Sequence, residues 1–400
     1  MMKVLYINTV FERGSTGKIV KQLGDSVVTL GGDYVVAYGR GIRKDNEHSY
    51  YIGSKMDRYV HAITSRFTDK AGFYSTKSTN ELIRFIRQYN PDIIHLHNLH
   101  GYYINIRILF NYLKTEFKGR IVWTLHDCWP FTGHCTHYTY AKCEKWKTLC
   151  SICGEKKSYP KSVFLDNSKE NYQEKKQLFT GINNLTIVTV SDWLKHQVEQ
   201  SFLNQYPIRR IYNGIDTDFF RQSKNDLREK YHIENKRVVL SVSDGWNERK
   251  GFNVIKNVSV EAPKDWIFIV IGLSKQQIKE LPENIIGITK TWDQKELIDY
   301  YSIADVLFNP SIEETFGLVT AEAMSCGTPA VVFNSTASPE LIQDENVGEI
   351  LDTNSSISEI IQALSVNYDG ALARKVVCEA FDQNIFRHQY MNVYEEAEGQ

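Results

Sequence analysis

Short apolar runs alternate with longer, charged stretches along most of the chain. Five such runs lie in the first half, at residues 4–8, 35–38, 93–97, 121–125 and 186–190. Five more follow with the same spacing, at residues 238–242, 266–271, 285–289, 306–309 and 330–333. Runs of this length are typical of buried strands, and the stretches between them are typical of helices. The pattern predicts an α/β fold of two Rossmann-like domains, each with a doubly wound parallel sheet.

The two series are separated by a polar segment at about residues 206–235. This segment contains Pro207 and the pair Asn213-Gly214, which are typical of turns. At 400 residues, the chain also exceeds the size that one hydrophobic core usually supports. We therefore place the first domain at residues 1–205 and the start of the second domain at residue 206.

The most informative segment is residues 311–324, SIEETFGLVTAEAM, which carries Glu314 and Glu322 eight positions apart. Pro310 ends the apolar run before it, and the composition after Gly317 is helical, so a helix is predicted to begin near Gly317. The free amides of a helix start attract phosphate, and a carboxylate two turns further on can reach sugar hydroxyls. The segment therefore suits a sugar nucleotide.

This segment resembles the E-x7-E signature of the retaining glycosyltransferases of family 4. The similarity continues through residues 325–332, SCGTPAVV, and residues 338–341, SPEL. The resemblance implies the GT-B architecture, in which two Rossmann-like domains face each other across a cleft. It also implies that the second domain occupies residues 206–383 and that a C-terminal helix at residues 384–400 crosses back to the first domain.

The resemblance assigns the donor-binding residues of the second domain. Glu322 is expected to bind the ribose and Glu314 the hydroxyls of the donor sugar. The sugar or phosphate is expected to contact the amides of Phe316, Gly317 and Leu318. The two carboxylates are then binders of hydroxyl groups rather than an acid–base pair.

Basic residues follow the strand predicted at residues 238–242. Positive charge at this place can neutralise the charge that develops on a departing diphosphate. Lys250 matches the phosphate-binding lysine of the family, whereas Asp244 stands where the family usually has an arginine. Arg249 either supplies the missing charge for donor binding or faces solvent.

A glycine-bearing loop, GSTGK at residues 14–18, follows the first predicted strand. It is not a P-loop, because Glu12 replaces the first glycine of that motif and Ile19 replaces its final Ser or Thr. The resemblance implies that the amides near Gly14 and Gly17 approach the donor diphosphate or the acceptor. Simple entry into a helix is the alternative.

Candidate acceptor contacts follow two strands of the first domain. His126 comes directly after the strand at residues 121–125, at the edge where open α/β sheets bind ligands, and by resemblance it positions the transferred sugar. On the strand at residues 93–97, the two histidines share one face. The resemblance to bacterial enzymes that build cell-surface polysaccharides favours acceptor or sugar contact, with metal binding and structural packing as alternatives. The acceptor-binding set is His95, His97, Asn98, His100 and Asp127.

Four of the seven cysteines lie close together in an aromatic-rich insertion at about residues 128–160. They are Cys135, Cys143, Cys150 and Cys153. A Cys-x2-Cys pair is a common half of a tetrahedral zinc site, and disulfides are rare in the cytosol. We predict a structural Zn²⁺ at the four thiols, with His134 or His137 able to replace one ligand. Ordinary reduced thiols are the alternative.

No catalytic metal or other catalytic cofactor is expected. Asp216 and Asp218 form the D-x-D pattern with which a different class of glycosyltransferase binds a metal. That pattern is short and common by chance. The surrounding residues 213–216, NGID, resemble the interdomain turn of family 4 instead.

The net charge of −1 conceals an asymmetry, because residues 1–205 contain 28 Lys and Arg against 18 Asp and Glu. A basic half favours an anionic partner such as a phospholipid surface or a lipid diphosphate, and scattered solvated lysines are the alternative. The segment between Lys55 and Arg87 is basic and aromatic, which suits either membrane contact or a mobile loop followed by a solvated helix. The basic residues accompany no nucleic-acid motif, so no nucleic-acid partner is expected.

The apolar runs are all shorter than the roughly 20 residues that a bilayer span requires. We therefore expect a cytoplasmic protein that is peripheral at the inner face of the cell membrane. This expectation agrees with a membrane-linked substrate for the basic half.

Taken with the resemblance, the sequence predicts a retaining glycosyltransferase of the hexosyltransferase type. The donor is a UDP- or GDP-linked sugar, and the acceptor is a hydroxyl of a glycan or lipid-diphosphate-linked glycan of a bacterial capsule, exopolysaccharide or colanic-acid-like polymer. His126, Glu314 and Lys250 form the predicted catalytic set. A sugar-nucleotide 2-epimerase of the same architecture and a non-catalytic subunit of a polysaccharide assembly complex are the alternatives.

Overall fold

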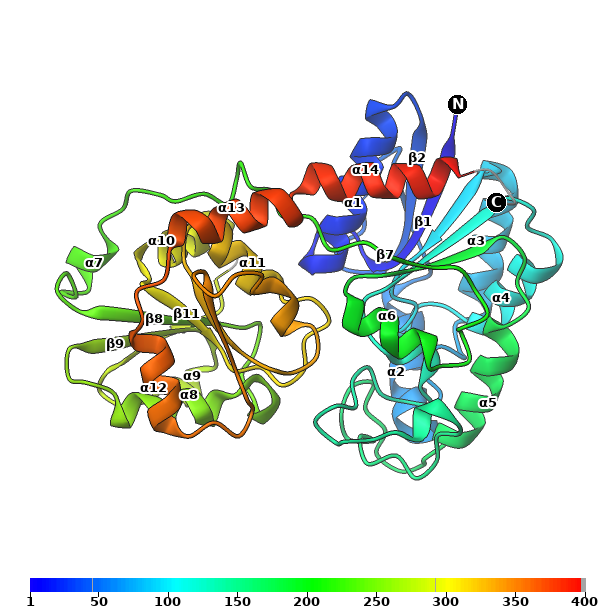
Figure 1. Ribbon diagram of the computed structural model, residues 1–400. Helices are drawn as coiled ribbons and strands as arrows, with labels where there is room; N and C mark the ends of the chain where they lie inside the picture. Colours follow the sequence, from blue (N-terminus) through cyan, green and yellow to red (C-terminus); the bar gives the residue numbers. More distant parts are fainter. Residues whose placement is uncertain (45, 292, 397–400) are drawn as a thin grey trace. The chain divides into compact units, whose positions relative to one another are not determined.

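The computed structural model describes residues 1–44, 46–291 and 293–396 of the 400-residue chain (Figure 1). The chain divides into two compact units. The first comprises Met1–Tyr212 and the chain from Arg387 on, and the second comprises Asn213–Phe386. Each unit is built around one parallel sheet with helices packed against it. The α/β class and the two Rossmann-like domains predicted from the sequence are confirmed.

The first unit has a seven-stranded parallel sheet with the order β3-β2-β1-β4-β5-β6-β7. The order reverses between β1 and β4, and open sheets bind ligands beside such a reversal. The strands are β1 (Lys3–Val10), β2 (Asp33–Arg40), β3 (Ser49–Tyr51), β4 (Ile93–Leu96), β5 (Arg120–Leu125), β6 (Leu185–Thr189) and β7 (Ile208–Arg210). The helices are α1 (Gly14–Thr29), α2 (Lys55–Thr68), α3 (Thr76–Tyr89), α4 (Ile106–Thr115), α5 (Ser168–Phe179), α6 (Asp192–Glu199) and most of α14 (Gln383–Glu395).

The second unit has a six-stranded parallel sheet with the order β10-β9-β8-β11-β12-β13, which reverses between β8 and β11. The strands are β8 (Arg237–Val242), β9 (Trp266–Leu273), β10 (Ile285–Thr289), β11 (Val306–Asn309), β12 (Ala330–Phe333) and β13 (Gly348–Leu351). The helices are α7 (Leu227–Lys230), α8 (Phe252–Glu261), α9 (Lys275–Ile278), α10 (Gln294–Ile303), α11 (Leu318–Ser325), α12 (Ile357–Ser365) and α13 (Gly370–Ala380).

The central strands are buried on both faces. In β1, the residues from Val4 to Ile7 are all fully buried. In the second unit, β9 carries the run WIFIVIGL, whose residues share one core with side chains of β8, β11 and α8. Strands that are covered on both sides read as unbroken apolar runs, which is why the sequence pattern locates them.

Of the strands in the described residues, ten coincide with the apolar runs of the sequence and three do not. These three, β3, β7 and β13, are short and lie at the edges of their sheets. An edge strand packs against only one neighbouring strand, so its residues are less fully buried and its apolar signal is weaker. Because β7 belongs to the first sheet, the first unit continues to Tyr212, beyond residue 205 where the sequence pattern changes.

Residues 387–396 pack behind the centre of the first sheet. The buried hydroxyl of Tyr394 lies 2.6 Å from Nδ1 of His95 on β4. The buried hydroxyl of Tyr390 lies 2.8 Å from Oγ1 of Thr124 on β5. Arg120 also donates a hydrogen bond to the carbonyl of Val393 at 2.7 Å. These contacts hold α14 against β4 and β5.

We expect Tyr394→Phe to lower the free energy of unfolding by about 1–3 kcal/mol, because it removes a buried partner of His95 and Tyr6. Urea denaturation followed by circular dichroism measures this loss. Tyr59→Phe is the matched control, because the Tyr59 side chain is exposed. Equal stabilities of the two variants would show that the buried hydroxyl does not stabilise α14.

Candidate active site

The donor residues predicted in the second unit come together at the carboxyl edge of its sheet. Lys250 follows β8, and Glu314 lies between β11 and α11. Nζ of Lys250 donates a hydrogen bond to Oε1 of Glu314 at 2.6 Å. Beside this pair, Nη1 of Arg249 lies 3.1 Å from Oε2 of Glu313. Arg249 therefore forms an ion pair at the site rather than facing solvent alone.

Helix α11 begins where the sequence predicts it. Gly317 precedes the helix with φ of 101°, a conformation that favours glycine. A β-carbon on Gly317 would also lie 3.0 Å from Cδ1 of Leu341, so the loop is closely packed. The left-handed turn at Gly317 thus joins the loop that carries Glu314 and Phe316 directly to Leu318, the first residue of α11.

Glu322 is oriented by a residue that the sequence does not reveal. The hydroxyl of Tyr301, on α10, donates a hydrogen bond to Oε2 of Glu322 at 3.0 Å. Burial raises the pKa of Tyr301 well above its ordinary value, with a further contribution from Glu322, so the hydroxyl remains a donor. Glu322 is thus held in one direction on the first helical turns after Gly317. The interaction joins α10 to α11 across 21 positions of sequence, which no local pattern indicates.

A hollow of about 710 Å³ lies in the second unit at the carboxyl ends of β8 and β9. Asp244, which replaces the arginine usual in the family, lines it and forms an ion pair with Lys290. The full lining is Asp244, Gly245, Trp246, Asn247, Gly272, Leu273, Ser274 and Gln277. None of these residues was predicted as a donor contact, and Asp244 was singled out only because it replaces an arginine.

In the first unit, His97 and His126 lie side by side because they follow the neighbouring strands β4 and β5. Nδ1 of His97 lies 2.9 Å from Nε2 of His126. Burial lowers the pKa of His97 well below its ordinary value and the pKa of His126 to about 4. Both rings are therefore neutral at neutral pH, and His126 can position a ligand without carrying charge.

The surroundings of His97 favour one arrangement of protons. Its Nε2 is buried and has no hydrogen-bond partner among the residues that the structure describes. If His97 donates from Nδ1, the unpaired atom is an acceptor, whereas the opposite tautomer would bury an unpaired N–H. A buried N–H group without a partner is rarer in proteins than a buried acceptor without one. We therefore assign Nδ1–H to His97, which leaves His126 accepting at Nε2 and carrying its proton on Nδ1.

His95 has a structural position rather than the acceptor contact expected for it. It is fully buried, and its two ring nitrogens lie 2.6 Å from the Tyr394 hydroxyl and 2.8 Å from Oγ1 of Thr124. Its ring packs against that of His97 with centroids 4.1 Å apart. Strand alternation correctly placed the two rings on one face, but it could not show that α14 covers His95. His95 supports His97 from behind.

His100 and Asp127 form a second pair at this edge. Nε2 of His100 lies 2.6 Å from Oδ2 of Asp127, and Nδ1 of His100 lies 3.1 Å from the hydroxyl of Tyr159. Burial acts to raise the pKa of Asp127, but the charge and hydrogen bond of His100 outweigh it, so the pKa is lowered. The neighbouring Asn98 is half-buried, and its carbonyl accepts a hydrogen bond from Thr9 at 3.0 Å. The structure thus groups four of the five predicted acceptor residues around His126.

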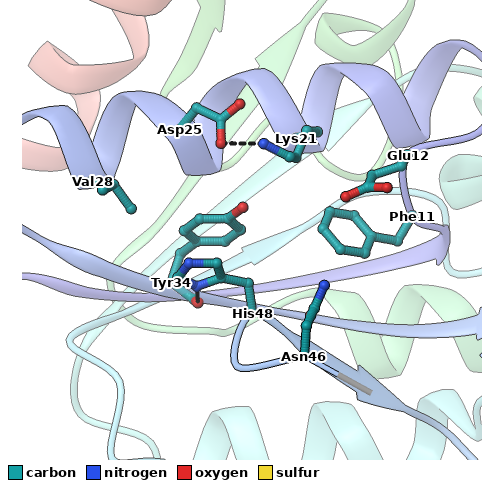
Figure 2. Close-up of a pocket in the computed structure, with 8 residues that line it drawn as sticks. All are labelled: Phe11, Glu12, Lys21, Asp25, Val28, Tyr34, Asn46 and His48. Carbon is teal, nitrogen blue, oxygen red and sulfur yellow. Dashed lines mark hydrogen bonds and ion pairs between the residues drawn. The ribbon is translucent and has the colours of Figure 1, made fainter. Parts of the chain in front are cut away.

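The glycine-bearing loop follows β1, on the other side of the strand reversal. Helix α1 begins at Gly14, which agrees with the alternative interpretation that this loop simply leads into a helix. A β-carbon on Gly17 would lie 3.2 Å from the amide nitrogen of Glu12, so glycine allows the loop to fold closely onto the helix. Phe11 and Glu12 also line a hollow of about 370 Å³ in which the Tyr34 ring stacks on His48 (Figure 2). None of the predicted site residues lines this hollow.

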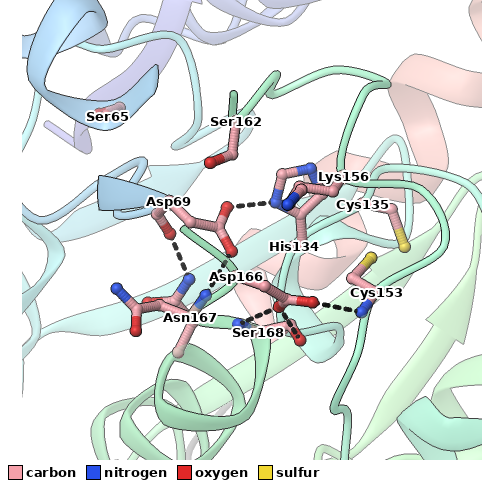
Figure 3. A network of polar contacts seen from close by, with 12 residues as sticks. Ser65, Asp69, His134, Cys135, Cys153, Lys156, Ser162, Asp166, Asn167 and Ser168 are labelled. Atoms are coloured by element: carbon pink, nitrogen blue, oxygen red, sulfur yellow. Dashed lines mark hydrogen bonds and ion pairs between the residues drawn. The ribbon is translucent and has the colours of Figure 1, made fainter. Parts of the chain in front are cut away.

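The cysteine-rich insertion is held by a polar network (Figure 3). His134 is buried and forms an ion pair through Nδ1 with Asp69 at the end of α2, and Asp69 also accepts a hydrogen bond from the amide of Asn167 at 2.9 Å. Asp166 accepts a hydrogen bond from the amide of Cys153 at 2.6 Å. The fully buried Lys175, another residue that sequence reasoning missed, donates to the carbonyl of Trp129 at 2.8 Å.

The cysteines of the insertion form no disulfide in the described part of the chain. The thiols of Cys135 and Cys153 are in hydrogen-bond contact, and Sγ of Cys150 accepts a hydrogen bond from the amide of Gly133 at 3.2 Å. Within residues 1–44, 46–291 and 293–396, no group of three or more His, Cys, Asp or Glu side chains is arranged to hold a metal ion. The zinc site at Cys135, Cys143, Cys150 and Cys153 therefore stays a prediction.

Comparison with known proteins agrees with this geometry. The model of Glycosyltransferase Family 4 matches residues 17–219, and the model of glycosyl transferases group 1 matches residues 223–374. Among related sequences, the colanic acid biosynthesis glycosyl transferase WcaC of Escherichia coli K12 is 25% identical over 86% of this chain and 85% of its own length. The O-antigen chain mannosyltransferase RfbU of Salmonella typhimurium is 29% identical over 36% of this chain and 41% of its own length.

Solved structures show the same fold. Sucrose-phosphate synthase from Thermosynechococcus elongatus superposes with a TM-score of 0.73 at 15% identity, covering 98% of both chains. HepE of Anabaena, solved with UDP and glucose, superposes with a TM-score of 0.65 at 15% identity, covering 98% of this chain and 99% of HepE. The Family 4 match alone spans more than half of the chain. The chain therefore belongs to glycosyltransferase family 4 and is a glycosyltransferase with the GT-B fold.

Proposed function

We propose that this enzyme transfers a hexose from a nucleoside diphosphate sugar to a hydroxyl of a surface glycan, with retention of anomeric configuration. The observation that carries the proposal is the grouping of Lys250, Glu314 and Glu322 around the start of α11. A cation there suits the diphosphate, and the carboxylates suit the hydroxyls of sugar and ribose. The names of WcaC and RfbU support a surface polysaccharide as the product.

The donor half of the proposal places the nucleotide in the second unit. The hollow lined by Asp244 is large enough for a base and ribose. Lys250 lies in the loop after β8 that also carries Asp244. The HepE structures contain UDP and UDP-glucose, which supports UDP as the first base to test and GDP as the second.

The transfer step needs charge stabilisation more than it needs a protein base. The bond between the sugar carbon and the phosphate oxygen breaks while a bond to the acceptor oxygen forms on the same face. The acceptor proton passes to the departing phosphate oxygen. Lys250 stabilises the charge on the diphosphate, and Glu314 is held by Lys250 where it can bind sugar hydroxyls.

The first unit supplies neutral hydrogen bonds and one polar pair to the acceptor side. His126 carries its proton on Nδ1 and donates to the transferred sugar. The acceptor, a glycan that is linked to a lipid diphosphate, contacts Asn98, His100 and Asp127. Transfer takes place at the inner face of the cell membrane. No helix in the described ranges is both long and apolar enough to span a bilayer.

Substitution of Lys250 is expected to weaken binding of UDP at least tenfold and to leave binding of uridine within about twofold. Only the diphosphate interacts with the lysine charge, which is worth roughly 1.5–3 kcal/mol. Isothermal titration calorimetry of Lys250→Ala with both ligands measures the difference. Lys264→Ala, which removes an exposed lysine of the same unit, is the matched control. A parallel loss of both ligands would contradict a phosphate-specific role.

Glu314→Gln is expected to lower kcat by about 10²-fold or more, since it removes a charged partner of the donor sugar and of Lys250. Release of UDP from UDP-sugars and NMR of the sugar product together measure the reaction. A product that stays linked to UDP but is inverted at carbon 2 would identify an epimerase. Full biological activity of Glu314→Gln would favour the non-catalytic subunit.

We also propose the structural Zn²⁺ of the insertion, held by Cys135, Cys143, Cys150 and Cys153. Its support is the contact between Cys135 and Cys153, the amide bond to Cys150, and the buried Nε2 of His134, which has no partner in the described part and offers a substitute ligand. Bound zinc would supply a cross-link between loops and no step of the transfer.

One equivalent of zinc is expected in the purified protein by elemental analysis. Cys143→Ser is expected to reduce it strongly, whereas the control Cys378→Ser, in the second unit, is expected to retain it. A fully folded protein without metal would refute the site.

A further inference from the structure

Helix α2 turns its apolar stripe to solvent. Five of its side chains are 37–68% exposed, namely Met56, Tyr59, Val60, Ile63 and Phe67. Their spacing places all five on one face of a helix. The buried side of the same helix carries His61 and Ser65. Surface helices ordinarily show the reverse arrangement, with apolar residues against the core.

Polar contacts fix this orientation of α2. Nδ1 of His61 lies 2.7 Å from Oγ of Ser75, and its Nε2 accepts a hydrogen bond from the amide of Gly72 at 3.1 Å. Burial lowers the pKa of His61 to about 3, so the ring is a neutral part of the core. Arg58 donates to the carbonyl of Gly39 at 2.6 Å. The helix is therefore anchored with its apolar stripe outward.

A second segment, about a hundred residues later in the sequence, extends the stripe. The amide of Val163 donates to the carbonyl of Arg66 at 2.7 Å, and the Phe164 ring stacks on Phe67 with centroids 5.2 Å apart. Val163, Phe164 and Leu165 are 52–64% exposed. Figure 1 shows α2 and the loops that precede α5 at the same end of the first unit. We call these eight residues, five from α2 and three from the loop, the apolar surface.

The charges on the two segments that form the apolar surface are mostly basic. Lys55, Arg66, Lys157 and Lys161 are exposed on the same two segments. Two carboxylates, Asp57 and Asp166, are also exposed on these segments, where Asp57 accepts hydrogen bonds from Ser54 and Ser78, and Asp166 accepts them from Cys153 and Ser168. The four cations outnumber the two anions, and apolar side chains beside an excess of Lys and Arg match the interface of an anionic bilayer.

We propose that the apolar surface docks onto an anionic phospholipid bilayer, with its aromatic and aliphatic side chains at the level of the headgroups and acyl chains. A second copy of the chain fits less well, because a symmetric dimer through this face would bring like-charged borders together. Single exposed apolar residues need no explanation, but a contiguous group of eight indicates an interaction site.

The loop that completes the apolar surface also leads to the predicted acceptor residues. Tyr159 lies four positions before Val163, and its hydroxyl is 3.1 Å from Nδ1 of His100, the partner of Asp127. Docking would therefore bring a lipid-linked acceptor to the side of the first unit that carries His100. This last step rests on the proposed function, whereas the docking itself does not.

Vesicle binding by the full chain tests the proposal. The wild type is expected to sediment with vesicles of equal phosphatidylglycerol and phosphatidylcholine and to bind pure phosphatidylcholine at least tenfold more weakly. The combined variant Val60→Ser, Ile63→Ser and Phe164→Ser is expected to bind the anionic vesicles at least tenfold more weakly than the wild type. The matched control is Val28→Ser with Leu30→Ser, two exposed apolar residues of the same unit outside the apolar surface, and it is expected to bind normally.

The charge contribution is tested separately. Arg66→Glu with Lys161→Glu is expected to abolish the preference for anionic vesicles, whereas Lys118→Glu, at another exposed site of the first unit, is expected to retain it. For direct insertion, the fluorescence of Val60→Trp is expected to be quenched by brominated lipid and that of Leu30→Trp is not, each measured relative to the wild type. Quenching that is equal at the two positions would overturn the proposal.

Two further outcomes would also overturn the proposal. One is wild-type binding by the triple serine variant. The other is a concentration-dependent dimer, seen by light scattering, that the same variant disrupts, since this would assign the surface to a second copy. Thermal stabilisation by UDP is measured on every variant. Its retention in a variant that loses vesicles shows a folded second unit, and its absence in the wild type would weaken the proposed function without affecting the docking result.

Discussion

The parallel direction of the strands is the constraint on which the candidate site residues of each unit depend. Each strand must be followed by a crossover connection, which contains a helix in most cases, so every loop that leaves a carboxyl end lies at the same edge of its sheet. In the first unit this brings His97 and His126 within 2.9 Å, although 29 positions separate them. In the second it brings Lys250 to Glu314 across 64 positions. The chemistry is assembled by topology rather than by proximity in sequence.

The two edges differ in how they treat charge. The second unit keeps its ionic groups paired, as in Lys250 with Glu314, which are both partly exposed, and Arg249 with the buried Glu313. The first unit buries its histidines, and burial keeps His97 and His126 neutral. A phosphate that gains charge during transfer is stabilised by the ionic edge, whereas the neutral rings of His97 and His126 can orient hydroxyls without competing for that charge. This division matches the proposed placing of donor and acceptor.

The sequence predicted the buried strands and the start of α11, because each depends on local composition or on a motif, and it singled out Lys250 and Glu314, which the structure brings into contact. It could not predict contacts that depend on distant packing. His95 looked available for a ligand because strand alternation shows which residues share a face, but not that Tyr394, 299 positions later, covers that face. Tyr301 was missed for the same reason, since its contact with Glu322 joins two helices. The three missed strands lie at sheet edges, where the apolar signal is weak.

Helix α2 shows the limit of reading amphipathicity alone. Its apolar period is plain in the sequence and would ordinarily predict a stripe that faces the core. The direction of the stripe is decided instead by His61, whose two ring nitrogens are bonded inside the unit. Turning the helix over would bury the apolar stripe but would also break these bonds and the contact between Arg58 and Gly39. These hydrogen bonds therefore keep Tyr59, Phe67 and the other apolar residues of the stripe at the surface. Burial of these residues requires a partner outside the chain.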